Sequence, residues 1–312
     1  MPRHRLTAAL PLLLALLVGT LPCFGSVALD LREIAPGVHV HQGVHELPDH
    51  RNRGEIANIG FIEGRRCVAV IDTGGSPEQG RALRDAIRAT TRTPICYVVN
   101  THVHPDHIYG NRAFREPGIH FIGHYKLAAA MAARAEFYRD KAHRDLGFAL
   151  TAEDFVLPDT EVKGQLELDL GERRLTLTAH RSAHTDNDLT VYDHATETLW
   201  LSDLLFMDHL PVIDGSLNGW LEVLERLTQL PARRAVPGHG PVAAFWPSDA
   251  LPQLQYLGQL QTELRNAIRQ GWTIERAIAS VGRSARNRWA LFDEFHPRNV
   301  ATGFAELEWE ED

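Results

Sequence analysis

The stretch THVHPDH (residues 101–107) places three histidines and one aspartate within six consecutive positions. It follows ICYVVN (residues 95–100), an apolar and β-branched run that predicts a buried strand, and Pro105 prevents that strand from continuing. Side chains at such a strand end commonly form the site of a layered α/β fold. Imidazole suits zinc, and the carboxylate of Asp106 lets one loop serve two metals. A solvated histidine-rich loop is the alternative, but four potential ligands in six residues favour a metal site.

Four further motifs occur along the chain in a fixed order around HVHPDH. They are VIDTGG (70–75), AHTDND (183–188), LSDLLF (201–206) and VPGHG (236–240). With this set, the sequence resembles the metallo-β-lactamase superfamily from Leu31 to about Pro247. More narrowly, EIAPGVHVHQG, IANIGFIEG and DGSLNGW resemble the quinoprotein relay system zinc metallohydrolases. Those are exported proteins associated with pyrroloquinoline quinone (PQQ)-dependent oxidation systems, and such an analogy says little about the substrate.

The resemblance implies an α/β layered fold, an αββα sandwich with two sheets face to face and helices outside. We expect this domain over residues 29–247 and a helical C-terminal extension over 248–312, packed on the same domain. The extension is predicted from apolar residues at helical spacing between Leu254 and Ile268. An oligomer contact and a cover over part of the site are alternative roles for the extension, and the candidates for a cover are Trp289, Phe292 and Phe295.

Local patterns predict the individual elements. Ser76, Pro77 and Gln79 are typical of a helix start with a capping box. Period-two alternation predicts hairpins over 166–179 and 189–201. Further strands are expected at residues 38–41, 56–63, 67–72 and 235–236, and further helices at 125–144 and from Trp220 to Leu227.

The first 28 residues predict a cleaved signal peptide. Arg3, His4 and Arg5 precede an apolar stretch over 10–21 that is too short to span a bilayer. Small residues lie before possible cuts after Ala28 or Gly25, and the neighbours of Cys23 make a poor acylation signal. We therefore expect a periplasmic or secreted protein with no membrane anchor.

The charge of the chain bears on its partners. Formal net charge is −8, and it falls to −10 when Arg3 and Arg5 leave with the signal peptide. This balance gives no reason to expect nucleic acid or an anionic membrane as a partner. The expected partners are a small-molecule substrate and periplasmic quinoprotein pathway proteins, and the oligomeric state stays open.

Two cysteines remain after export, Cys67 and Cys96, and each begins a short apolar run. In the superfamily those two strands are neighbours in one sheet. An oxidising compartment permits a disulfide, but two buried thiols are equally compatible with the sequence. Neither cysteine lies in a metal motif, so both are excluded as ligands.

The resemblance also assigns a ligand set. It implies one zinc on His102, His104 and His184, a second on Asp106, His107 and His239, and Asp203 as a carboxylate bridging both. The implied reaction is hydrolysis by a metal-bound hydroxide, with Asp106 and Asp203 as catalytic carboxylates. A core role for His184 and a turn-capping role for Asp203 are the structural alternatives. Asp72 is expected to accept a hydrogen bond from a ligand histidine or the ligand loop, and two weaker candidates for such support are Thr101 and Asn187.

Substrate contacts are harder to predict. The candidates lie between the Asp203 motif and the Trp220 helix, and they are Asp214, Ser216 and Asn218. The early loop over residues 45–53 is either a wall of the substrate cleft or a solvated polar loop.

Four other functions remain open at the level of sequence. A persulfide dioxygenase-like enzyme would use one iron, which leaves Asp106, His107 and His239 without a role, and a glyoxalase II-like thioesterase shares the scaffold. A β-lactamase is disfavoured because Asp203 stands where lactamase classes carry Cys or Ser. A non-catalytic zinc protein would need a closed coordination shell. Zinc, two ions per chain, is the expected cofactor, with iron as the alternative.

Overall fold

The structure, a computed structural model, describes Met1 and residues 29–310, so the predicted signal peptide lies outside the described residues. Its first sheet has seven strands in sequential order. Strands β1 to β4 are antiparallel neighbours and β4 to β7 are parallel. The strands are β1 (Arg32–Ala35), β2 (Val38–His41), β3 (Ile59–Glu63), β4 (Val68–Ile71), β5 (Ile95–Asn100), β6 (His120–His124) and β7 (Thr160–Val162).

The second sheet has six strands in the order β13-β12-β11-β10-β9-β8, with β11 and β12 parallel and the other pairs antiparallel. The strands are β8 (Gln165–Asp169), β9 (Arg174–Ala179), β10 (Leu189–Asp193), β11 (Thr198–Phe206), β12 (Arg234–His239) and β13 (Ala244–Phe245).

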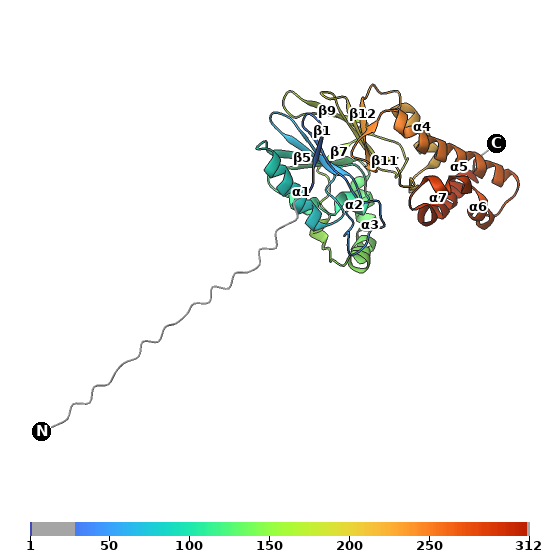
Figure 1. The fold of residues 1–312 in the computed structure, drawn as a ribbon, viewed down its shortest axis with the longest axis horizontal. Coiled ribbons are helices and arrows are strands. Elements are labelled where there is room, and N and C mark those ends of the chain that lie inside the picture. Colours follow the sequence, from blue (N-terminus) through green and yellow to red (C-terminus); the bar gives the residue numbers. More distant parts are fainter. Residues whose placement is uncertain (2–28, 311–312) are drawn as a thin grey trace.

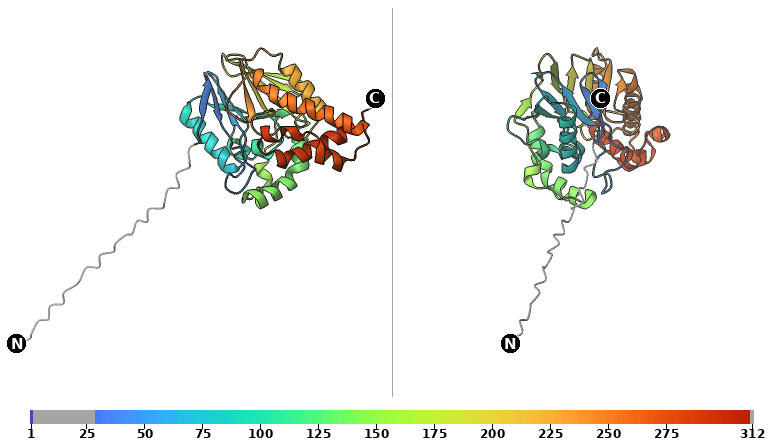
Figure 2. Two further views of the ribbon diagram at one scale, coloured as in Figure 1. Left: turned by 45° about the vertical axis from the view of Figure 1, so that its right-hand side comes forward. Right: turned by 60° about the vertical axis from the view of Figure 1, so that its left-hand side comes forward.

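Helices cover the outer faces of both sheets (Figures 1 and 2). The α-helices are α1 (Pro77–Thr90), α2 (Pro105–Ile108), α3 (Leu127–Lys141), α4 (Leu217–Leu227), α5 (Leu251–Arg269), α6 (Ile274–Ser280) and α7 (Phe292–Leu307). Short 3-10 turns occur at Asn111–Phe114, Ala152–Asp154, Ser248–Ala250 and Arg283–Arg288, and a π-helical turn at Ala142–Leu146. Among the described residues, no helix is both long and apolar enough to cross a membrane.

Strand alternation builds the layers, because successive side chains of a strand point to opposite faces. In β4, Ile71 packs between the two sheets, in the same cluster as Leu177, while Val70 packs outward against Leu83 of α1. On the far side, α4, α5 and α7 bury their apolar faces with β11 residues such as Leu201 in one large cluster. This is the predicted αββα sandwich, with the C-terminal helices packed on it.

Several boundaries differ from the predictions. The strand expected to end at Leu201 continues fully buried to Phe206 as β11, and the short strand at Ala235 continues to His239 as β12. Ser76 caps α1 as predicted, but the Gln79 side chain accepts from the Gly75 N–H, one residue before the cap.

The structure joins Cys67 and Cys96 by a disulfide, with Cα atoms 5.5 Å apart. The sequence left open whether these cysteines are bridged or are free thiols, and in the structure they are bridged. It connects the parallel strands β4 and β5 near their starts, and the carboxyl ends of the same strands lead into Asp72 and the THVHPDH loop.

Candidate metal centre

Seven side chains with metal-binding atoms converge where the carboxyl ends of β4 and β5 meet those of β11 and β12. They fall into two groups, and within each group the candidate ligand atoms lie within 4.8 Å of one another. The first group is His102, His104, His184 and Asp203, and the second is Asp106, His107 and His239. The structure thus brings together all seven residues that the resemblance implied as ligands.

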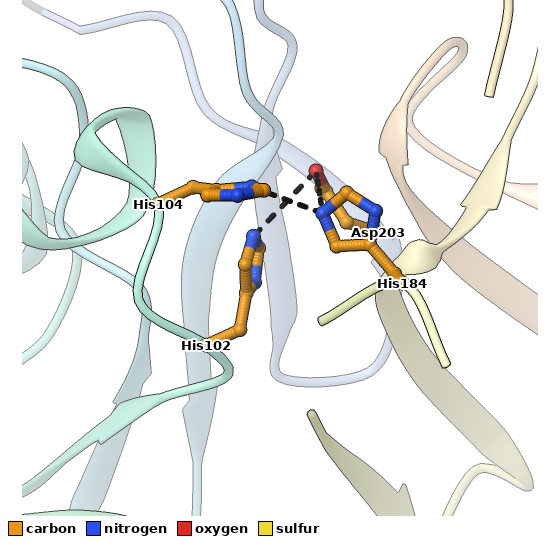
Figure 3. Close-up of side chains that lie close together, drawn as sticks. All are labelled: His102, His104, His184 and Asp203. Atoms are coloured by element: carbon orange, nitrogen blue, oxygen red, sulfur yellow. Dashed lines mark hydrogen bonds and ion pairs between the residues drawn. The ribbon is translucent and has the colours of Figure 1, made fainter. Parts of the chain in front are cut away.

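The first group surrounds a common point (Figure 3). His184 Nε2 lies 3.0 Å from His104 Nδ1 and 3.3 Å from Asp203 Oδ2. His102 Nε2 faces the same carboxylate oxygen at 3.6 Å. His104 therefore presents Nδ1 to the centre, whereas His102 and His184 present Nε2.

Asp203 also reaches the second group. Its Oδ1 lies 3.1 Å from His107 Nε2, and its Oδ2 lies 3.4 Å from His239 Nε2. Asp106 Oδ2 completes this group at 3.5 Å from His107 Nε2 and 3.4 Å from His239 Nε2. The Asp203 carboxylate therefore stands between both groups, which is the position of a bridging ligand.

The nitrogen of each histidine that points away from the centre has a protein partner. His184 Nδ1 donates to Val212 O at 2.7 Å and His239 Nδ1 donates to Ile56 O at 2.9 Å. The other partners are Asp72 Oδ2 for His107 Nδ1 (2.8 Å), Asp214 Oδ2 for His104 Nε2 (3.1 Å) and Thr101 Oγ1 for His102 Nδ1 (3.0 Å). Such bonds fix the ring orientation and leave the inner nitrogen free as a ligand.

Buried atoms at this centre fit a cation. His102 Nε2, His107 Nε2 and Asp203 Oδ1 are buried, and apart from the 3.1 Å contact between the last two they have no hydrogen-bond partner among the described residues. Unpaired buried polar atoms are costly, and a metal ion would satisfy all three of them. Five imidazoles and two carboxylates are a donor set that suits zinc, with iron also compatible.

Burial and neighbouring charges shift the pKa values of the side chains at the centre. Burial and the neighbouring imidazoles lower the pKa of His102 well below its usual value. Burial acts the same way on His239, but the carboxylates of Asp203 and Asp106 outweigh it and raise the pKa of His239 to about 9. Burial disfavours the Asp106 carboxylate, yet His107 and His239 bring its pKa down to about 2. The Asp106 carboxylate therefore stays ionised and remains an acceptor at neutral pH.

Asp72 organises the loop of the histidine motif. It is fully buried, and its carboxylate accepts hydrogen bonds from Thr101 N, Thr101 Oγ1 and His107 Nδ1, each at 2.8 Å. Its backbone has φ +56°, a left-handed conformation that costs a non-glycine residue about 1 kcal/mol or more. The roles expected for Asp72 and Thr101 agree with these contacts.

Gly238 allows β12 to pass close to β11. A Cβ atom at this position would lie 1.9 Å from Asp203 Oδ1 and 2.7 Å from Asp203 N. Glycine is the residue that permits such a close approach of a backbone to a side chain. The glycine before His239 therefore leaves the space that the Asp203 carboxylate occupies.

Comparison with known families gives the fold an identity. The family model of the metallo-beta-lactamase superfamily matches residues 52–239, which include all seven converging residues. The chain belongs to the metallo-β-lactamase superfamily.

Solved structures of other superfamily members share this fold. A metallo-beta-lactamase from Pontibacter korlensis superposes with a TM-score of 0.60 and 22% identity, covering 73% of this chain and 98% of its own. TMB-1 gives a TM-score of 0.58 and 16% identity over 74% and 97% of the two chains. A double mutant of the sec-alkyl sulfatase PisA1 gives 0.67 and 18% identity, covering 90% of this chain and 50% of the sulfatase.

One protein with a detectable sequence match resembles a short part of this chain. The linear primary-alkylsulfatase from a Pseudomonas species is 42% identical over 54 residues, which is 17% of this chain. The match spans only a tenth of that relative's own length.

A cleft of about 300 Å³ opens onto the centre. The loop that follows β2 contributes Leu47, Pro48 and Ile56, so part of the early loop is a wall of the cleft. Sequence reasoning missed Lys141 and Arg298, the two cationic side chains of the wall, and of the three aromatic cover candidates only Phe295 lies there. Most of the remaining wall is apolar, with Tyr109, Leu146, Phe206 and Val212, and His209 adds a polar side chain.

The three residues predicted as substrate contacts make hydrogen bonds within the protein, and substrate binding by them stays a prediction. Asp214 bonds His104 and Arg298 instead of lining the cleft. Ser216 caps α4 and donates to Glu306, and Asn218 bonds Gln261 and Glu310. These side chains attach the C-terminal helices to the sandwich.

The supporting role expected for Asn187 stays a prediction. Its side-chain amide donates to Asp186, and it bonds none of the seven converging residues. The neighbouring Asp188 supports the His184 loop instead, because its carboxylate accepts from Thr185 N and Thr185 Oγ1. Burial raises the pKa of Asp188 to about 6.

Proposed function

We propose that this protein is a dinuclear zinc hydrolase acting on an ester, thioester or amide-like small substrate. The observation that carries this proposal is the Asp203 carboxylate, which lies within 3.6 Å of nitrogen atoms from both groups. A pair of zinc ions at such a site supplies Lewis-acid polarisation of a substrate oxygen and a water molecule of lowered pKa. His102, His104 and His184 would hold one ion, Asp106, His107 and His239 the other, and Asp203 both.

The chain's own residues supply positioning and charge around the reacting bond. Asp106 lines the cleft as an ionised carboxylate, so an oxygen that is not engaged with a metal can accept a hydrogen bond from a water or from the substrate and orient it. Phe206 and Leu146 give the cleft apolar walls that exclude bulk water. Lys141 and Arg298 also line the cleft, and each is ion-paired there, Lys141 with Asp145 and Arg298 with Asp214, so their charges are largely balanced within the protein.

The setting that we propose is export and a link to PQQ-dependent periplasmic oxidation. The motif resemblance supports this link, and the Cys67–Cys96 disulfide is typical of a protein that folds in an oxidising compartment. The partners would be a small-molecule substrate and quinoprotein pathway proteins.

A second candidate substrate class is sulfate esters. The 54-residue match to the alkylsulfatase and the fold likeness to the sec-alkyl sulfatase favour it. A one-iron persulfide dioxygenase-like site, a glyoxalase II-like enzyme and a β-lactamase remain alternatives that assays can separate. A purely structural zinc pair is less compatible with a cleft that reaches Asp106, His184 and His239.

Metal content and a substrate panel together test the proposal. Purified protein should contain about two zinc ions per chain, and Asp203→Ala should lower this number and abolish hydrolysis in a panel of carboxylic esters, thioesters, lactams and alkyl sulfates. Asp186→Ala is the matched control, because Asp186 pairs with Lys126 and lies outside both groups. One iron per chain, unchanged by Asp106→Ala, would refute the dinuclear zinc assignment.

A further inference from the structure

The segment of residues 211–216, which we call the support segment, lies between β11 and α4 and contacts the first group of ligands. Its Val212 carbonyl accepts from His184 Nδ1 at 2.7 Å. Its Asp214 carboxylate bonds His104 Nε2 at 3.1 Å, and the Asp214 N–H donates to His184 O at 2.9 Å. Two of the three histidines in this group are therefore oriented by a segment that contributes no ligand itself.

Helix α7 holds the support segment. Asn299 is fully buried, and its amide donates to Pro211 O at 2.6 Å and accepts from Ile213 N at 2.9 Å. Arg298, the residue before Asn299 on the helix, pairs with Asp214 Oδ1. About two turns further on, Glu306 accepts from Ser216 Oγ and Leu217 N, both at 2.6 Å.

Two residues of α7 bond the support segment at points that bear on the histidines. Asn299 satisfies one backbone donor and one backbone acceptor within three residues of each other, which fixes their spacing. The Arg298 guanidinium leaves the second oxygen of Asp214 for His104, so the carboxylate receives a bond from each side. Ligand histidines depend on such outer partners for ring orientation and for basicity of the inner nitrogen.

We propose that α7 is a positioning element of the metal centre, with Arg298 acting on His104 through Asp214 and Asn299 fixing the backbone that orients His184. The C-terminal extension, which lies outside the residues matched by the family model, thereby sets the metal affinity of the three-histidine group. This inference rests on metal binding in the proposed function and is independent of which bond is hydrolysed.

The test measures zinc affinity in the absence of substrate, by titration of the full chain against a chromophoric chelator. The variants are Arg298→Gln, Asp214→Asn and the double variant, with Arg298→Lys as the conservative replacement. Arg286→Gln is the matched control, because Arg286 pairs with Asp293 on the exposed side of the extension, away from the centre. Unfolding of the zinc-free proteins checks that each variant is folded.

Arg298→Gln should weaken one of the two zinc-binding steps by about tenfold, and Arg298→Lys by less. Arg286→Gln should bind zinc as the unsubstituted chain does. The decisive comparison is the double variant, which should bind zinc no more weakly than Asp214→Asn alone, because Arg298 acts through Asp214. Unchanged affinity in Arg298→Gln, or losses that add fully in the double variant, would overturn the inference. If no tested substrate is hydrolysed but this pattern appears, the hydrolase proposal fails and the inference about α7 stands.

Discussion

Replacement of Asp72 by asparagine isolates the contribution of one buried carboxylate to metal binding. In the structure, three donors point at this carboxylate at 2.8 Å, namely Thr101 N, Thr101 Oγ1 and His107 Nδ1. Asparagine has the same shape but only one acceptor oxygen. If that oxygen keeps the Thr101 N–H, the new NH₂ group faces His107 Nδ1, which also carries a hydrogen.

The magnitude follows from this donor–donor contact. His107 can relieve it by moving its proton to Nε2, the nitrogen that faces Asp203 and would bind the metal. A buried donor left without an acceptor costs about 1–3 kcal/mol. Loss of an outer partner of a ligand histidine typically weakens metal binding about 10–100-fold, which is the same range of free energy. We therefore expect Asp72→Asn to weaken zinc binding by about 10–100-fold.

The assay is a competition titration for zinc, with urea unfolding of the zinc-free protein beside it. Asp193→Asn is the matched control, because Asp193 is also fully buried but pairs with Arg173 at the end of β10 remote from the centre. The control should lose about 3–5 kcal/mol of stability and keep its zinc affinity. Zinc affinity of Asp72→Asn within twofold of the unsubstituted protein would refute the reasoning.

Three further predictions follow from particular contacts. Gly238→Ala should lose zinc and about 1–3 kcal/mol of stability, because the new Cβ overlaps Asp203. Gly258→Ala in α5 is the control: nothing lies within 4 Å of its new Cβ, so the change should be neutral or stabilising. Elemental analysis and urea unfolding measure both effects. Replacing both Cys67 and Cys96 by serine should lower the free energy of unfolding by about 3–4 kcal/mol for a bridge over 29 residues, and an unchanged urea midpoint would contradict this. Burial, with Arg226 and His124, lowers the pKa of His180 from 6.5 to about 4, so the unfolded chain binds the proton more tightly and stability falls as the pH drops below 6.5. Because of His180, the free energy of unfolding should fall by about 2 kcal/mol between pH 7 and pH 5. Urea unfolding at both pH values should show that His180→Gln removes this fall.

The sequence predicted what local patterns and ordered motifs encode. The sandwich, the strand ends that lead into THVHPDH, and the cap at Ser76 depend on residues close together in the chain. The contacts that the sequence did not predict join residues that are distant in the chain. Asp214, Ser216 and Asn218 were interpreted as substrate contacts because they follow Asp203, but their partners are Arg298, Glu306 and Glu310, which no periodicity connects to them.

Strand lengths at the centre were also underestimated for a physical reason. The strand was expected to end at Leu201, yet Ser202 and Asp203 continue β11. Their side chains have buried partners from the first half of the chain, Thr101 for Ser202 and His107 for Asp203. Asn187 and Asp188 could not be told apart from the motif, because which of two adjacent polar side chains turns inward depends on backbone geometry.

The ligands are divided between the two sheets in a way that affects maturation of the protein. The first half, through β7, supplies His102, His104, Asp106 and His107, and the second half supplies His184, Asp203 and His239. Neither half contains three ligands of the first group, and the second group also draws on both. A metal ion held by a whole group, as proposed, would therefore require both halves of the chain to be folded together. Such an ion would link one half of the chain to the other, so we expect metal occupancy to report that both halves have assembled.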